Sequence, residues 1–206
     1  MQKGLNAIFP LPFFIEQAEG SEYQSIQREL TEVKSKLKFN DTGINMILND
    51  DPFRSHFLLS YQCNHTLNFI NKNIESYITS LHGESKIKWK VIESWMTKTL
   101  TGRSAREHNH NAHDISGVYY LDTNGKDGNL VLNNVHPHLV ANGLLTDVYK
   151  YVDLELPLEN GIIMLWPSQL RHRTLVKQTD HERISISFNI NLRRKGFGLP
   201  IEYNKD

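Results

Sequence analysis

A series of short strand-like segments in the second half of the chain constrains the fold most strongly. From Lys86 onward helical spacing of apolar residues is nearly absent, and Ile87, Trp89 and Val91 alternate with lysines as in a half-buried strand. Turn-forming runs rich in Asn and Gly separate several of the segments. Many short strands without intervening helices predict a mainly β fold, a sandwich or barrel of the class that includes the jelly roll. The segments that follow are Glu93–Leu100, Arg106–His110, Ile115–Asp122, Asn129–Asn133, Tyr149–Leu156, Gly161–Trp166, Arg171–Val176 and Ile184–Leu192.

The first part of the chain carries two amphipathic helices instead. Apolar residues recur at helical spacing from Tyr23 to Leu37, preceded by a predicted capping box at Ser21, and again from Cys63 to Leu81 before Gly83. No linker separates these helices from the strands. We therefore expect one domain over 1–206, with helical support in 1–85 and a β core in 86–195.

Charge and cysteine content exclude several classes of function. Lys+Arg and Asp+Glu both number 23 among the 206 residues, and a zero net charge disfavours binding to nucleic acid. The single cysteine, Cys63, permits neither an internal disulfide nor a cysteine-based zinc cluster. No apolar run suits a signal peptide or a membrane span, so we expect a cytoplasmic protein.

A histidine-rich stretch, residues 106–114, offers candidate metal ligands. In an extended chain side chains two apart share a face, so His108 and His110 can chelate a first-row metal together. His172 can supply a third ligand from elsewhere in the sequence. His113, His136 and His138 are expected to be loop residues. These residues predict a metal-dependent enzyme.

A second candidate element is the strand that begins at Arg183. Arg183, Ser185 and Ser187 share one face, and apolar residues occupy the other. Burying an arginine is costly unless it meets an anion, and its planar fork suits a carboxylate. The strand therefore predicts an anion anchor eleven residues after His172.

Taken in order, these motifs resemble a known family. His108-x-His110, the segment Ser116–Leu121, Trp166-Pro-Ser168, His172 and Arg183-x-Ser185 are similar to the Fe(II)/2-oxoglutarate-dependent oxygenase superfamily, and to its branch of uncharacterised oxygenases from bacteria and phages. The resemblance covers about residues 90–190. It implies a double-stranded β-helix, the cupin-like jelly roll, flanked here by N-terminal helices.

The same resemblance implies roles for individual residues. His108 and His172 would bind Fe(II), and His110 stands where the superfamily usually has a carboxylate. Asp114 is the rival for that position. Arg183 would pair with the distal carboxylate of the co-substrate 2-oxoglutarate, assisted by Ser185 and Tyr120.

The implied activity is a dioxygenase that hydroxylates a small molecule or a protein side chain and releases succinate and carbon dioxide. Two alternatives remain. One is a three-histidine cupin-like dioxygenase that does not use 2-oxoglutarate, and the other is a non-catalytic binding module on a β scaffold.

Overall fold

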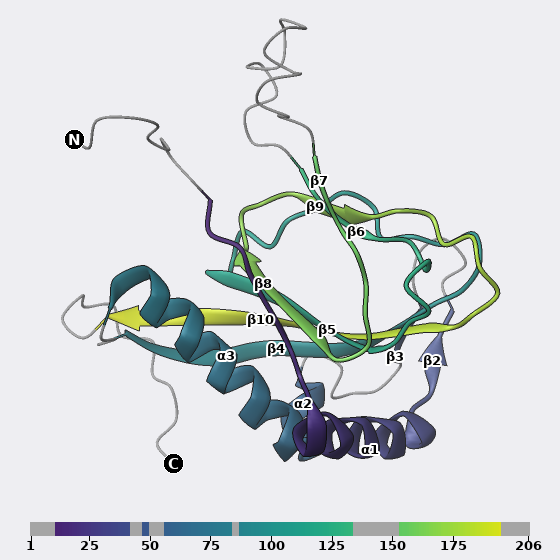
Figure 1. The fold of residues 1–206 in the computed structure, drawn as a ribbon, viewed down its shortest axis with the longest axis horizontal. Coiled ribbons are helices and arrows are strands. Elements are labelled where there is room, and N and C mark those ends of the chain that lie inside the picture. Colours follow the sequence, from purple (N-terminus) through teal and green to yellow (C-terminus); the bar gives the residue numbers. More distant parts are fainter. Residues whose placement is uncertain (1–10, 42–46, 50–55, 84–86, 134–152, 195–206) are drawn as a thin grey trace, which may run out of the picture.

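The computed structural model describes residues 11–41, 47–49, 56–83, 87–133 and 153–194. Its strands form two antiparallel sheets that lie one above the other in Figure 1. The larger sheet has the order β1-β8-β5-β10-β4-β3-β2 and the smaller one β7-β6-β9. Their bounds are β1 Phe14–Gln17, β2 Phe39–Asn40, β3 Ile47–Asn49, β4 Ile87–Thr99, β5 Ile115–Asp122, β6 Leu130–Leu132, β7 Leu154–Leu156, β8 Ile162–Pro167, β9 His172–Thr174 and β10 Arg183–Arg194.

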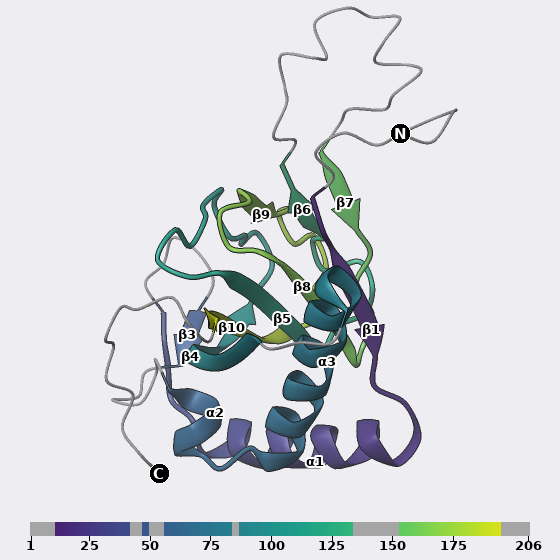
Figure 2. The same ribbon diagram turned by 90° about the vertical axis from the view of Figure 1, so that its left-hand side faces the viewer.

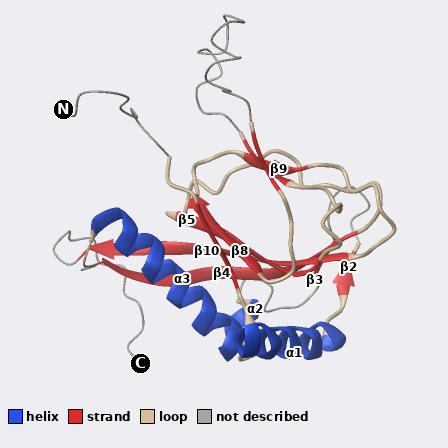
Figure 3. Ribbon diagram, in the orientation of Figure 1, coloured by secondary structure: helices blue, strands red, loops and turns tan. Residues whose placement is uncertain are grey.

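The helices pack on the face of the larger sheet that points away from the smaller one. They are α1 (Gly20–Lys36), α2 (Phe57–Ser60) and α3 (Asn64–His82), and Figures 2 and 3 show them together on that side. None of the helices in the described part of the chain has the length and apolarity to cross a bilayer. This arrangement is a mainly β double-stranded β-helix with N-terminal helices, and it confirms the predicted fold class.

The helices follow from their apolar stripes. Ile26, Leu30 and Val33 of α1 are buried, as are Ile70 and Ile74 of α3. The carboxylate of Glu29 on α1 accepts hydrogen bonds from the first turn of α3, at 2.9 Å from the backbone nitrogens of His65 and Thr66. This contact satisfies amide groups that a helix leaves open at its N-terminus and fixes the two helices against each other.

Alternation along β10 divides the interior into two cores. Ile184, Ile186, Phe188 and Ile190 join the outer core beneath the helices. The inner core lies between the sheets and contains Val118, Tyr120, Leu130, Leu132, Leu156, Leu158, Ile162, Met164, Trp166 and Leu170. The opposite face of β10, starting at Arg183, turns toward this inner space, as a period of two requires.

Three details of the sequence prediction are wrong. The helix α1 begins at Gly20, so Ser21 lies inside its first turn, and Glu19 precedes it without a side-chain cap. The segments at Lys86 and Glu93 form one continuous strand, β4, because the pairing with β10 runs through a bulge rather than a break. Arg106–His110 is not a strand: among its residues only His108 makes a β-bridge, to His172. The start of the predicted segment Tyr149–Leu156 lies outside the described residues.

Candidate metal and co-substrate site

The loop 105–114 is held against the segment that contains β9 by a ladder of backbone hydrogen bonds. The amide of His108 donates to the carbonyl of His172 at 3.0 Å, and the amide of His172 donates back at 2.9 Å. The amide of His110 donates to Ser168 at 2.8 Å, and that of Thr174 to Ala105 at 3.1 Å. These contacts join two parts of the chain about sixty residues apart and fix the relative positions of their histidines.

Three imidazoles converge at this ladder. The side chains of His108, His110 and His172 each present a ring nitrogen, and these nitrogens all lie within 4.8 Å of one another. The ring centroids are 4.3 Å apart for His108 and His172 and 5.3 Å apart for His110 and His172. Such a cluster has the donor set and the spacing that a first-row transition metal requires.

The outer nitrogens of two rings are already engaged. Nδ1 of His108 lies 2.7 Å from the carbonyl oxygen of Arg106, and Nδ1 of His172 lies 3.0 Å from that of Leu170. A carbonyl can only accept, so Nδ1 carries the proton and the lone pair of Nε2 is left for a metal. Both contacts reach two residues back along the chain, so the ring orientation is set locally.

The protonation state also suits a metal. Burial, reinforced by the nearby His108 ring, lowers the pKa of His110 to about 4. Burial likewise lowers the pKa of His172 to about 4, against an opposing contribution from the Leu170 carbonyl. At neutral pH both rings are uncharged, which is the form that binds a metal. The residues present therefore fit a resident divalent cation.

The other acidic and histidine candidates of this stretch lie elsewhere. The carboxylate of Asp114 accepts a hydrogen bond from the backbone amide of Leu192 at 2.7 Å. His113 contacts Asn191 through Nδ1 at 3.0 Å and Glu93 through Nε2 at 3.2 Å. His136 and His138 lie outside the described residues. Of the two rivals for the third position, the structure brings His110 to the cluster and directs Asp114 to β10.

A cavity between the two sheets connects the histidine cluster to β10. Its lining includes the three histidines and also Arg183, Ser185 and Tyr120, for which the family resemblance implies a role in binding the co-substrate. Trp95 and Trp166 flank the cluster, with ring centroids 6.1 Å from His110 and 5.0 Å from His172, respectively. The rest of the wall is formed by Ala105, Ser116, Gly117, Val118, Leu130, Thr174, Ser187, Phe188 and Asn189.

Arg183 marks the closed end of the cavity. Its guanidinium group donates through Nη1 to the backbone carbonyls of Asp127, at 2.8 Å, and Gly128, and through Nη2 to Thr99 Oγ1 at 3.0 Å. Tyr120 lies beside it, with the guanidinium carbon 6.0 Å from the ring centroid. Arg183 is only 1% exposed, so a ligand can reach it only through the cavity.

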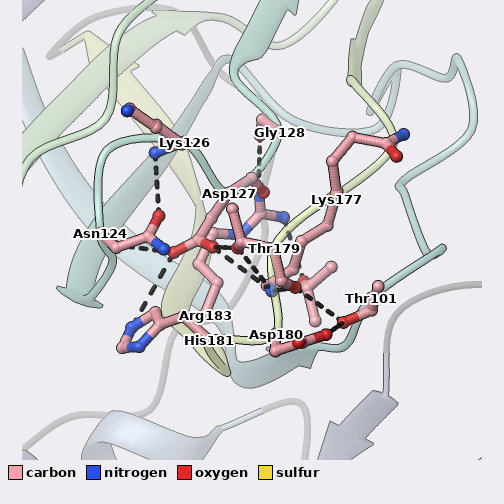
Figure 4. A network of polar contacts seen from close by, with 12 residues as sticks. Thr101, Asn124, Lys126, Asp127, Gly128, Lys177, Thr179, Asp180, His181 and Arg183 are labelled. Carbon is pink, nitrogen blue, oxygen red and sulfur yellow. Dashed lines mark hydrogen bonds and ion pairs between the residues drawn. The ribbon is translucent and has the colours of Figure 1, made fainter.

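The closed end also contains charged residues that the sequence did not single out. Figure 4 shows Asp127, Lys177 and Thr179 in a polar network around Arg183. Asp127 belongs to a turn between β5 and β6, and Lys177 follows β9. Neither position has a periodic or motif signal, because their significance comes from a contact between segments fifty residues apart. The contact between Asp127 and Lys177 could be predicted only once the fold was known.

Comparison with known proteins finds a family that resembles the second half of the chain. Residues 93–189 match the model of a family described as "Putative 2OG-Fe(II) oxygenase". The chain is similar to this family over these residues. The match spans the segments that carry the histidine cluster and Arg183, so the class of chemistry is that of an oxidoreductase that uses iron and 2-oxoglutarate.

Solved structures share the fold at low sequence identity. The α-ketoglutarate-dependent epimerase SnoN from nogalamycin biosynthesis superimposes with a TM-score of 0.64 at 12% identity, over 95% of this chain and 87% of that one. HygX from Streptomyces hygroscopicus, with nickel and 2-oxoglutarate bound, gives 0.55 at 11% identity over 91% and 84%. A Pseudomonas putida prolyl-4-hydroxylase gives 0.52 at 15% identity over 90% and 94%. Curated protein sequences contain no match to this chain.

Proposed function

We propose that this oxygenase binds Fe(II) through His108, His110 and His172 and holds 2-oxoglutarate by its distal carboxylate at Arg183. The observation that carries the proposal is one continuous cavity that contains both the convergent imidazoles and a buried arginine. Iron bound there together with 2-oxoglutarate supplies the oxidising chemistry, with release of succinate and carbon dioxide.

The residues of the chain would bind and orient the metal and 2-oxoglutarate. The carbonyls of Arg106 and Leu170 hold the His108 and His172 rings with Nε2 toward the metal. Arg183 would meet the distal carboxylate, and Ser185 and Tyr120 lie on the same lining, where their hydroxyls would donate hydrogen bonds to it. The indoles of Trp95 and Trp166 keep water away from the cluster. No side chain is needed as an acid or a base.

His110 gives the site an unusual charge. Three neutral imidazoles leave the full positive charge of a divalent cation, whereas the common triad of two histidines and one carboxylate removes one unit. We expect the extra charge to strengthen the attraction for the 2-oxoglutarate dianion and to shift the reduction potential of iron upward.

The same residue favours one alternative. Three-histidine iron sites also suit a cupin-like dioxygenase that needs no 2-oxoglutarate, and in such an enzyme Arg183 would have no co-substrate to bind. The buried guanidinium on the cavity wall supports the 2-oxoglutarate reading. A non-catalytic binding module would leave the histidine cluster without a purpose.

We further propose hydroxylation of a small molecule or a protein side chain as the outcome. Structural neighbours include an epimerase and a carbocyclase, and HygX has been solved with hygromycin B bound, so the fold accepts several reactions and small-molecule ligands. The zero net charge argues against nucleic acid. A cytoplasmic location, where the single buried thiol of Cys63 would stay reduced, and a single domain over 1–206 complete the proposal.

Turnover of 2-oxoglutarate tests the proposal directly. Succinate release by the full chain should require Fe(II), and Arg183→Ala should raise the KM for 2-oxoglutarate at least about tenfold, since a buried charge-assisted contact contributes about 2 kcal/mol or more. Arg28→Ala, which changes an exposed arginine on α1, is the control and should leave the KM unchanged. Iron-dependent turnover that is undiminished in Arg183→Ala would sink the assignment of the anchor. Oxygen consumption without any requirement for 2-oxoglutarate would favour the cupin-like alternative.

A further inference from the structure

Three charged side chains are buried together at the closed end of the cavity. Asp127 and Lys177 are 0% exposed and Arg183 is 1% exposed. In the described part of the chain no other aspartate, glutamate, lysine or arginine is buried to this degree. Charges are rarely buried without a partner, so this group needs an explanation beyond packing.

Lys177 and Asp127 form an ion pair. The Lys177 Nζ lies 3.3 Å from Asp127 Oδ1, and it also donates to the backbone carbonyl and the hydroxyl of Thr179. The amide of Lys177 donates to Arg103, and its carbonyl accepts from Gly102, so its backbone is held as firmly as its side chain. This lysine is therefore fixed in place, unlike an ordinary solvated lysine.

Asp127 shapes the turn that receives Arg183. Its Oδ2 accepts hydrogen bonds from Thr123 Oγ1 at 3.1 Å and from the Asn124 amide at 2.8 Å, and its Oδ1 accepts one from Thr179. The turn so formed aims the carbonyls of Asp127 and Gly128 at the Arg183 guanidinium (Figure 4). The carboxylate thus organises the support of the arginine, but it also places a negative charge close to an intended anion site.

The net charge of Asp127, Lys177 and Arg183 is positive. One buried carboxylate and two buried cations leave one net positive charge at the closed end of the cavity. If Lys177 were neutral, Asp127 would cancel the charge of Arg183, and an incoming carboxylate would meet no net attraction. In a medium of low dielectric such a change in net charge alters affinity strongly.

We propose that Lys177 is a positioning residue for the co-substrate: it compensates the buried charge of Asp127, so that the closed end keeps a net positive charge for the distal carboxylate of 2-oxoglutarate. The inference rests on the proposed role of Arg183. It assigns a function to a residue that belongs neither to the metal cluster nor to the cavity lining.

The proposal predicts that 2-oxoglutarate binding weakened by one substitution is restored by a second one. Lys177→Met keeps the length and apolar stem of the side chain but removes the charge, and should weaken 2-oxoglutarate binding about tenfold or more. Adding Asp127→Asn to that variant restores the net positive charge and should return the Kd to within about threefold of wild type. A purely structural role predicts the opposite, because the second substitution would add its own loss to the first.

The experiment uses the full chain loaded with nickel, so that 2-oxoglutarate binds without turnover and its Kd can be measured by equilibrium dialysis near pH 8. Thermal unfolding of each variant reports whether it is folded. Lys126→Met is the matched control: it removes a lysine one residue from Asp127, but an exposed one, and should leave the Kd within about twofold of wild type.

Each outcome decides between the possibilities. A tenfold loss in Lys177→Met that Asp127→Asn rescues supports the proposal, whereas an unchanged Kd in Lys177→Met, or a double variant weaker than the single one, overturns it. If Lys177→Met does not fold, the double variant is compared with wild type alone, and a Kd raised more than about tenfold overturns the proposal. Wild-type protein that binds nickel but no 2-oxoglutarate overturns the proposed function itself, and this inference with it.

Discussion

The two ends of the cavity are built by different forces. At the metal end three imidazoles are aligned by a backbone ladder between residues 105–114 and 168–174, and two of them are oriented by their own neighbouring carbonyls. At the anion end, full charges are buried and must balance one another, and a tight turn supports the arginine. The first end depends on which side chains are present, and the second on net charge and backbone shape.

This contrast has consequences for substitution. Removing a ligand at the metal end should abolish one function and leave the fold intact, because a neutral histidine can leave without exposing a buried charge. Changes at the anion end should affect stability and binding together. Substitutions can therefore test the two ends separately.

His110→Ala should lower the affinity for Fe(II) more than about 100-fold, since even the loss of an outer-shell partner costs 10- to 100-fold. The ring supplies one of three nitrogens in the cluster. Anaerobic titration with Fe(II) measures the affinity, and thermal unfolding of the metal-free protein should change little.

Asp114→Asn is the matched test of the rival ligand. Its carboxylate bonds the Leu192 amide, so we expect a modest loss of stability, about 1 kcal/mol, and unchanged iron affinity. The reverse pattern, with iron lost in Asp114→Asn and retained in His110→Ala, would move the ligand to Asp114 and require the loop to rearrange around the metal.

Gly128→Ala should damage the anion end through the backbone. Gly128 has a φ of +83°, and a Cβ there would lie 2.3 Å from the carbonyl oxygen of Leu175. A left-handed conformation alone costs about 1–2 kcal/mol, and the collision with a backbone atom adds to it, so we expect a loss of about 3 kcal/mol or more. The displaced carbonyl of Gly128 would also weaken the support of Arg183.

Gly125 provides the control in the same turn. Its φ is +75°, but the nearest atom to an added Cβ is the Leu158 carbonyl oxygen at 3.5 Å, an ordinary contact. Gly125→Ala should cost about 1–2 kcal/mol from the backbone conformation alone and leave 2-oxoglutarate binding intact. Equal losses of unfolding free energy in Gly128→Ala and Gly125→Ala, measured by chemical denaturation, would show that the contact with Leu175 does not contribute to the destabilisation.

The parts of the fold that sequence could predict are those with local periodicity. The alternation along Arg183–Asn189 separates a polar face from an apolar one, and the structure places these faces on the cavity and in the outer core. The stripes at Ile26 and Ile70 likewise predict which helix faces are buried. In both cases the spacing of the apolar residues equals the period of the backbone, about 2 residues in a strand and about 3.6 in a helix.

The site needed more than periodicity. The pairing of His108 with His172 followed from the order of motifs in a family. The strand predicted for Arg106–His110 is absent, because a single β-bridge, from His108 to His172, is the only β pairing of this segment. The partnership of Asp127 with Lys177 had no sequence signal at all. From the sequence, a lysine after a short strand is expected to be exposed to solvent. Lys177 is buried because β6 and β9 pair side by side.

Acidification should reveal the buried pair of Asp127 and Lys177. Burial raises the pKa of Asp127, but hydrogen bonds from Thr179, Asn124, Thr123 and Lys177 outweigh it, and the pKa is lowered overall. A carboxyl whose pKa is lower in the folded state stabilises the fold above its unfolded pKa, about 3.9, and loses this contribution as the pH falls through the folded value. Metal-free wild type should therefore lose up to about 1.4 kcal/mol per pH unit more than the Asp127→Asn/Lys177→Met double variant below about pH 4. Urea denaturation at several pH values measures the difference, and parallel curves for the two proteins would mean that Asp127 titrates alike in the folded and unfolded states.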